Sequence, residues 1–324
     1  MADLKIGNRV RVRILRTSAL AAAMTFVFAI FAFRAAEWTK GLNSGFIVYG
    51  QASTATGGTT SGGGSTGAST TKIVAQITSG NFGDVEPRNY GTVMEIVNPG
   101  TTAVTLSGNF YNENGTAATV PYVSNASNLT IARGSFSNYS LAGGMILVIS
   151  TGTTAETTPL VGTTTWGKFT ASGPLSVTSF FEVRHSVTRQ LFERVGVPAS
   201  RADMGSFIIA RVREKQNADG IRAGLADIDT GFALVNTGSA STVVTVTIKD
   251  VNGQTVGTPK AIALTANQHI ENFAFLVFSD FYEAAGEGRK YQYIKFDANP
   301  ATVAATGLSI EGGSLSSFPV DPIQ

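Results

Sequence analysis

Residue types that carry out acid–base, nucleophilic or metal chemistry are scarce in this chain. Its only histidines are His185 and His269, and the absence of cysteine excludes disulfides and thiolate metal sites. The two histidines stand at different places in the two halves of the chain, so they do not indicate a shared site. No Ser/His/Asp arrangement can be assembled around either one. We therefore predict structural or surface roles for both, with no catalytic residues, no cofactor and no enzymatic activity.

The strongest metal candidates are three aspartates in one loop-rich stretch, Asp219, Asp227 and Asp229. Carboxylate oxygens are the ligands that calcium prefers, but the spacing does not match a twelve-residue EF-hand loop. The favoured interpretation is a solvated turn that keeps an edge strand charged. Calcium binding is the alternative, and no other metal site is expected.

Three aromatic residues, Trp166, Tyr291 and Tyr293, are the candidates for platforms that stack against sugars. Aromatic residues make up 9% of the chain and most of them are phenylalanine, which suits a core better than a sugar-binding surface. A carbohydrate-binding module is thus an alternative function, and it requires these side chains to be exposed and coplanar.

The elements that position these residues come from an internal repeat. At an offset of 138 residues, Gly91–Gly100 falls within Ile228–Gly238 and the Asn114-Gly115 turn falls on Asn252-Gly253, so the spacing from Asn98 to Gly115 equals that from Asn236 to Gly253 without a gap. An Asn-x-Gly or Asn-Gly sequence between apolar runs is typical of a tight turn, and we expect the glycines to supply the positive-φ positions.

The runs between these turns predict strands. Val104–Phe110 and Val243–Lys249 are suited to half-buried strands, and Trp166–Ala171 matches Tyr293–Ala298 after the offset has drifted by about eleven residues. Two copies of one sandwich explain this pattern better than a single large barrel. Helix is scarce, and the best candidate is Asn272–Ala285, for which a strand is the alternative.

The repeat resembles that of exported bacterial proteins, mostly uncharacterised, with tandem immunoglobulin-like β-sandwich domains. The resemblance rests on Gly231–Gly238, Val243–Gly253, Leu264–His269 and Gly307–Pro319. The first copy matches more loosely, since Arg133-Gly134-Ser135 departs from the Leu-x-Ala-Asn element. The resemblance implies the fold and brings no catalytic residues with it. We therefore expect an all-β protein with two tandem immunoglobulin-like sandwiches.

The N-terminal region predicts export. Residues 1–40 contain seven of the 24 Lys and Arg residues, and an uncharged run over 17–33 follows the arginines. This order is typical of a hydrophobic helix that is either a cleaved signal peptide or a retained signal anchor. Residues 41–71 follow as a flexible Gly/Ser/Thr-rich tether. The expected domains are thus 72–200 and 201–324, located outside the cytoplasm, with extracellular, cell-surface and periplasmic positions left open.

The tether begins with a short apolar arm, Phe46, Ile47, Val48 and Tyr49. The arm either extends the export segment or adds as a strand to a sheet edge of a neighbouring subunit. The favoured function is a non-catalytic structural or adhesive surface protein that contacts itself, other surface proteins or glycans. A filament built through the arm is the first alternative. The mildly acidic body has no long basic stripe, so nucleic acid is not expected as a partner.

Overall fold

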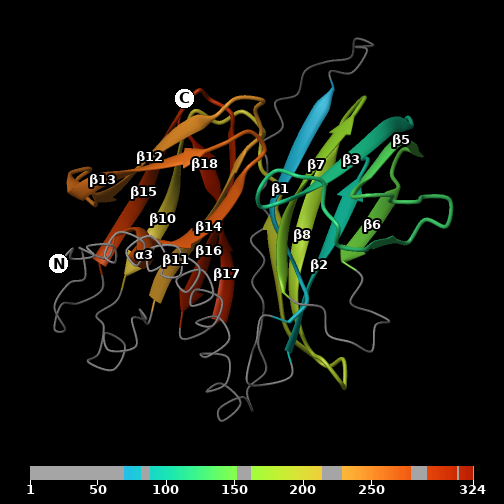
Figure 1. Ribbon diagram of the computed structural model, residues 1–324, viewed down its shortest axis with the longest axis horizontal. Helices are drawn as coiled ribbons and strands as arrows, with labels where there is room; N and C mark the ends of the chain where they lie inside the picture. The colour runs from blue at the N-terminus through green and yellow to red at the C-terminus, as the bar shows by residue number, and fades with distance from the viewer. Residues whose placement is uncertain are drawn as a thin grey trace, which may run out of the picture.

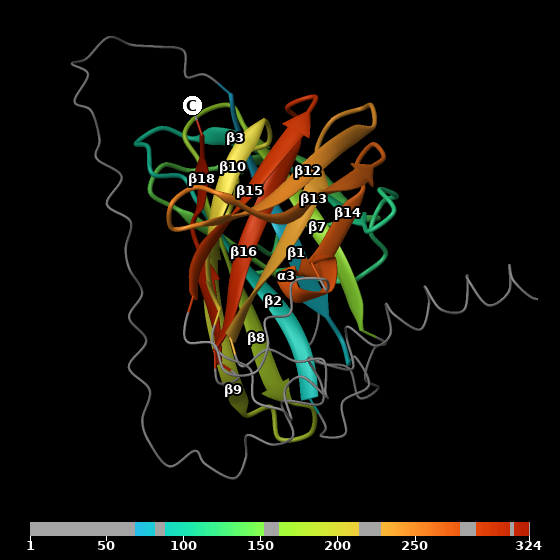
Figure 2. The ribbon, with the colours of Figure 1, turned by 90° about the vertical axis from the view of Figure 1, so that its left-hand side faces the viewer.

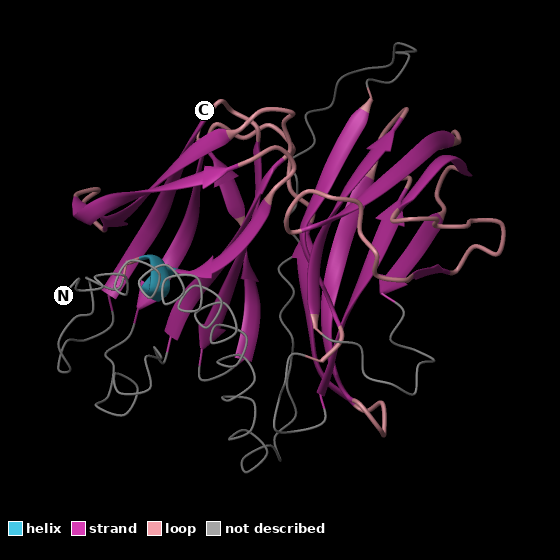
Figure 3. Cartoon of the chain, viewed as in Figure 1, coloured by secondary structure: helices cyan, strands magenta, loops and turns pink. Residues whose placement is uncertain are grey.

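The computed structural model describes residues 69–81, 88–151, 162–213, 228–278, 290–311 and 314–323. Residues 1–40, most of the tether and the arm Phe46–Tyr49 lie outside this part of the chain. The described residues are almost entirely antiparallel strands, so the prediction of an all-β fold is confirmed (Figure 3). In the described ranges, no helix is long and apolar enough to cross a membrane.

The first half of the chain forms a sandwich of two sheets. Its strands are β1 (Thr70–Ser79), β2 (Arg88–Val97), β3 (Val104–Asn112), β4 (Tyr122–Ser124), β5 (Ser135–Leu141), β6 (Ile146–Thr151), β7 (Thr163–Ala171), β8 (Ser176–His185) and β9 (Leu191–Pro198). Sheet I has the order β1-β7-β3-β5, and sheet II has the order β4-β6-β2-β8-β9. Strand β1 starts slightly earlier than the expected domain boundary, because Thr70 and Thr71 pair with Ala171 and Thr170.

The second half forms another sandwich. Its strands are β10 (Ser206–Arg213), β11 (Ile228–Asn236), β12 (Thr242–Asp250), β13 (Thr255–Leu264), β14 (His269–Phe273), β15 (Lys290–Asn299), β16 (Val303–Glu311), β17 (Ser314–Phe318) and β18 (Val320–Pro322). Sheet III has the order β14-β11-β16-β17, and sheet IV has the order β13-β12-β15-β10-β18. Figure 1 shows the two sandwiches side by side.

The strand orders of the two sandwiches correspond. Sheet I matches the β10-β15-β12-β13 part of sheet IV, and the β9-β8-β2-β6 part of sheet II matches sheet III. Strand β4 is an addition in the first sandwich, and β18 is an addition in the second. The correspondence follows chain order throughout, as expected for two copies of one topology.

Each sandwich closes its own core, and the alternation of side chains explains why. In β12 every second residue from Thr242 to Val246 is buried, and β3 alternates in the same way over Val104–Phe110. Alternation of this kind is typical of strands with one face in a core and the other outside it. The largest buried side chains of the first core include Phe110 and Phe169, and those of the second include Phe207 and Phe296.

The repeated asparagine forms the same buried corner in both sandwiches. The Asn98 Nδ2 donates to the carbonyl oxygens of Thr102 and Leu141, at 2.8 and 3.0 Å, and its Oδ1 accepts from the Gly100 N–H at 3.0 Å. In the second sandwich, Asn236 makes the matching bonds to Ala240 (2.7 Å), Leu264 (3.3 Å) and Gly238 (3.0 Å). A buried amide that satisfies several backbone groups locks the end of one strand to the next connection.

The turn glycines have two different roles. Gly115 and Gly253 adopt φ values of +83° and +76°, which confirms the positive-φ requirement at the Asn-Gly turns. The same expectation is wrong for Gly100 and Gly238, which are not among the positive-φ residues. A Cβ there would lie 3.2 Å from the Oδ1 of the corner asparagine, so these positions need glycine for close approach.

The expected helix at Asn272–Ala285 lies only partly within the described residues, and its first two residues are in a strand. Asn272 and Phe273 belong to β14, and only the single turn α3 (Ala274–Val277) is helical. Ala274 and Phe278 are buried in the second core. This helical turn therefore packs on the core of the second sandwich. Residues 279–289 lie outside the described part.

Candidate functional site

The two sandwiches meet in a buried junction between sheet I and sheet III. Val74 and Ile77 of β1 belong to the first core, whereas Ile73 and Ala75 point the other way and contact the second sandwich. They pack with Trp166, Val235 and Ala304 in a separate apolar cluster. The β8–β9 edge of sheet II adds to this junction, because its residues Phe181, Val195 and Val197 pack on Leu308 and Leu315 of sheet III.

Trp166 lies at the centre of this junction and is fully buried. Its ring stacks on that of Tyr111, with centroids 4.3 Å apart and planes inclined by 18°. Its Nε1 donates to the Asn267 carbonyl oxygen across the junction at 3.0 Å. The prediction that Trp166 is a sugar-stacking platform is therefore wrong. The ring is covered because a second sheet packs on it.

Polar contacts also cross the junction. The Gln76 Nε2 donates to the Glu271 Oε2 at 2.5 Å, and the His269 backbone N–H donates to the Glu113 carbonyl oxygen at 2.9 Å. At the other end of the junction, the Leu315 N–H donates to the Glu193 Oε1 at 2.8 Å. These bonds fix the register of the two sandwiches, since apolar packing alone is not directional.

Burial raises the pKa of two carboxyl groups in the junction. Burial raises the pKa of Glu271 to about 8, and the nearby charge of Glu113 adds to the increase. Burial also raises the pKa of Glu113 itself. A raised pKa of this kind is common in active sites, but it follows equally from burial in a structural interface.

The two histidines occupy different environments. His269 is buried in the junction, where burial lowers its pKa to about 3, and neither ring nitrogen has a hydrogen-bond partner among the described residues. His185 is the last residue of β8, and its Nδ1 accepts from the N–H groups of Val187 and Thr188 in the following turn, both at 3.1 Å. The structure does not bring the two histidines together.

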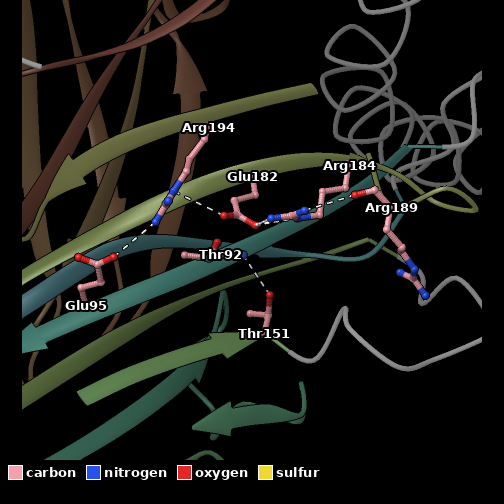
Figure 4. Close-up of polar contacts among 7 residues, drawn as sticks. All are labelled: Thr92, Glu95, Thr151, Glu182, Arg184, Arg189 and Arg194. Atoms are coloured by element: carbon pink, nitrogen blue, oxygen red, sulfur yellow. Dashed lines mark hydrogen bonds and ion pairs between the residues drawn. The ribbon is translucent and has the colours of Figure 1, made fainter. Parts of the chain in front are cut away.

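A second concentration of charge lies on the outward face of sheet II (Figure 4). Arg194 lies between two carboxylates, 3.4 Å from Glu95 and 3.5 Å from Glu182, and its guanidinium lies 4.0 Å from the centroid of the Phe180 ring. Arg184 binds the other Glu182 oxygen at 2.8 Å. The arginines are already neutralised by these acids, which disfavours a polyanion site and agrees with a self-contained surface network.

The remaining sequence-predicted residues divide into described and undescribed ones. Asp219 and Asp227 lie outside the described residues, as does the Asp229 side chain, although its backbone belongs to β11. In the described part of the chain, no group of three potential metal ligands is found. Tyr291 and Tyr293 lie on the outward face of sheet IV, with Tyr291 56% exposed and Tyr293 half-buried.

Sequence reasoning missed the junction, although the chain carries a pattern for it. All residues from Thr230 to Asn236 and from Val303 to Ser309 are buried, and β1 contains an unbroken buried run over 73–77. Continuous apolar runs are typical of strands covered on both faces, in contrast to the alternation in β12.

Comparisons with protein-family models, curated proteins and solved structures found no match to this chain.

Proposed function

We propose that this chain is a non-catalytic, exported structural or adhesive protein whose two immunoglobulin-like sandwiches act as one rigid unit on the cell surface. The observation that carries the proposal is the junction itself. Its polar groups, Gln76 and Glu271 among them, are buried between the sheets and contact each other, so they serve the architecture instead of facing a substrate.

A rigid double module suits a spacer or an adhesin. Independent sandwiches on a flexible linker would change their relative orientation freely, whereas a junction with a buried indole and directional hydrogen bonds holds one orientation. The N-terminal basic-hydrophobic segment and the Gly/Ser/Thr-rich tether would place this unit away from the membrane that exports it. Such a module presents the outward faces of sheets II and IV to partners.

The proposal is tested by locating the protein and assaying it. Protease shaving of intact cells of the source organism should release peptides of 69–324, and mass spectrometry of the N-terminal peptide should show export with or without cleavage. The purified chain should leave glycan, peptide and ester libraries unchanged. A strictly cytoplasmic location or turnover of any library member contradicts the proposal.

The carbohydrate-binding alternative now rests on Tyr291 and Tyr293, because Trp166 is buried. Adjacent tyrosines on an exposed sheet face are the observation that favours it. Glycan-array binding that disappears in Tyr291→Ala while unfolding is unchanged would support it. The absence of binding to any glycan would remove it.

A further inference from the structure

The junction joins the outward faces of two sheets that are not equivalent to each other. For each of them the chain contains one further, equivalent sheet. Sheet I packs on sheet III inside the molecule. Sheet IV has the strand order of sheet I, and sheet II contains the strand order of sheet III. Sheets II and IV each have one face in the core of their own sandwich and an outward face that no other sheet of the chain covers in the described residues. The molecule thus has two open faces that correspond to the two halves of its own junction.

The strand registers identify equivalent positions on sheets I and IV. Tyr111 pairs with Trp166, and Lys249 pairs with Tyr293, so Tyr293 occupies the position of the buried indole. Likewise Ile73 pairs with Lys168, and Ile208 pairs with Lys295. The open face of sheet IV, which Figure 2 views from its own side, therefore repeats an aromatic residue and an isoleucine of the junction.

The same comparison holds for sheets III and II. In sheet III, Val235 pairs with both Ala304 and His269, and all three lie in the junction. In sheet II, Val97 pairs with Ser176 and Ile146 at the equivalent positions. The open face of sheet II has no charged residue at these three positions. The buried histidine is replaced by an isoleucine that is 49% exposed.

Exposed apolar side chains gather around both open faces. On or beside sheet II these are Val123, Met145 and Ile146, and on or beside sheet IV they are Val243, Val251 and Tyr291. Between 47% and 74% of the surface of each is exposed. The ends of a stack of repeated modules are normally polar caps, because an uncapped end exposes the surface that a further module would cover. Here each open face carries both apolar and charged side chains: sheet II has the ion pairs of Arg184 and Arg194 with Glu95 and Glu182, and sheet IV has Lys249 and Lys295.

We infer that sheet IV of one molecule packs face to face on sheet II of a second copy, as sheet I packs on sheet III within the chain. Such a contact joins two different faces, so it does not close on itself and adds molecules in a linear stack. A second copy is the expected occupant because the contact continues an interface that the chain already contains. This association requires neither a cell-surface location nor the N-terminal arm.

The test measures self-association of the full chain in a fixed concentration of mild detergent, by sedimentation velocity over a concentration series and by electron microscopy. The unmodified chain should form concentration-dependent linear oligomers. Ile146→Lys on sheet II and Tyr293→Lys on sheet IV should each weaken association at least about tenfold. Val187→Lys, at an apolar and more exposed position in the β8–β9 turn, is the control and should associate normally.

Mixing the two single-face variants distinguishes this arrangement from a symmetric one. Each variant alone should be monomeric, but an equimolar mixture should form 1:1 complexes and nothing longer, since one intact face remains on each partner. If one variant alone still dimerises, the contact is symmetric and the inference is wrong. Monomeric behaviour of the unmodified chain also overturns it.

Two further variants keep the test decisive. Met145→Lys and Val251→Lys repeat the two substitutions at other exposed positions, in case either first variant unfolds, which circular dichroism melting would reveal. Deleting residues 41–52 should leave association unchanged. If this deletion abolishes association while the face variants do not, strand addition by the arm holds the molecules together and the face-to-face contact is wrong.

Discussion

The two sandwiches share a strand order and a buried asparagine corner, yet the outward face of sheet I is covered and the equivalent face of sheet IV is open. In the first sandwich, sheet I is covered by sheet III and carries the fully buried Trp166. In the second, the equivalent position of sheet IV carries the half-buried Tyr293, with Lys249 beside it. The difference teaches that corners and inward-facing residues specify the sandwich, whereas a few outward-facing residues specify what packs on it.

The largest expected effect separates Trp166 from its equivalent. Trp166→Ala removes a buried ring and its hydrogen bond to the Asn267 carbonyl oxygen, and it should lower the free energy of unfolding by roughly 3–5 kcal/mol. Tyr293→Ala should lower it by less than about 1 kcal/mol, because the side chain is on an open face. Urea denaturation of the full chain measures both. Equal losses of unfolding free energy would contradict the contrast between a covered ring at Trp166 and a ring on an open face at Tyr293.

The next effect depends on pH and concerns the junction alone. The pKa of Glu271 is raised from 4.5 to about 8, so the protonated form is favoured in the folded state and stability falls as pH rises from about 4.5 to 8. The pKa of His269 is lowered from 6.5 to about 3, so stability also falls as pH decreases from about 6.5 to 3. Stability should therefore be greatest between about pH 4.5 and 6.5.

Replacing the buried carboxyl group tests this pH dependence. Glu271→Gln keeps an amide that can bond to Gln76 and removes the group that must ionise, so the variant should be more stable than the unmodified chain by roughly 3–4 kcal/mol at pH 8.5 and nearly equal at pH 5. Glu95→Gln, at an exposed ion pair with Arg194, is the control and should change little at either pH. A gain that is the same at both pH values would mean that Glu271 is not held neutral.

The corner asparagines give a smaller contrast between the sandwiches. Asn236 also donates to the Thr265 carbonyl oxygen at 2.9 Å and accepts from the Thr302 hydroxyl at 2.9 Å, which are bonds without a counterpart among those of Asn98. Asn236→Ala should cost about 2–3 kcal/mol and Asn98→Ala about 1–2 kcal/mol, because each leaves buried backbone groups without partners. Thermal or urea unfolding of the two variants ranks them. The reverse order would contradict the hydrogen-bond count.

The sequence was sufficient for features that depend on local chemistry. The Val/Thr runs became strands, and Gly115 and Gly253 took the positive φ that their Asn-Gly turns require. It was insufficient for contacts between distant segments. Trp166 was a candidate for an exposed platform in the carbohydrate-binding alternative, and Gln76 and Glu271 were not identified. Their partners in the other sandwich are distant in sequence, about one hundred residues away for Trp166 and about two hundred for Gln76 and Glu271. The unbroken buried runs of β11 and β16 indicate that both faces of these strands are covered, but an apolar run does not identify the segment that covers it.

The smallest contrast concerns the two Asn-Gly turns that lie at equivalent ends of sheets I and IV. A Cβ at Gly115 would lie 2.8 Å from the Ala266 carbonyl oxygen of the second sandwich, whereas a Cβ at Gly253 would meet only the Tyr293 hydroxyl, at 3.9 Å. Both substitutions place alanine at positive φ, which costs about 1 kcal/mol. Gly253→Ala should therefore cost about that much, and Gly115→Ala about 1–2 kcal/mol more, since the turn must also move away from the junction.

Combining Gly115→Ala and Gly253→Ala with Trp166→Ala separates a loss of stability that arises in the junction from one that arises within the turn itself. If the additional loss in Gly115→Ala arises from the junction, it should shrink once Trp166→Ala has loosened that contact, and the two losses should fall short of additive. The loss in Gly253→Ala should remain the same in either background, because that turn faces solvent in the single chain. A double-mutant cycle by urea denaturation measures both, and full additivity for Gly115 would locate its cost within the first sandwich alone.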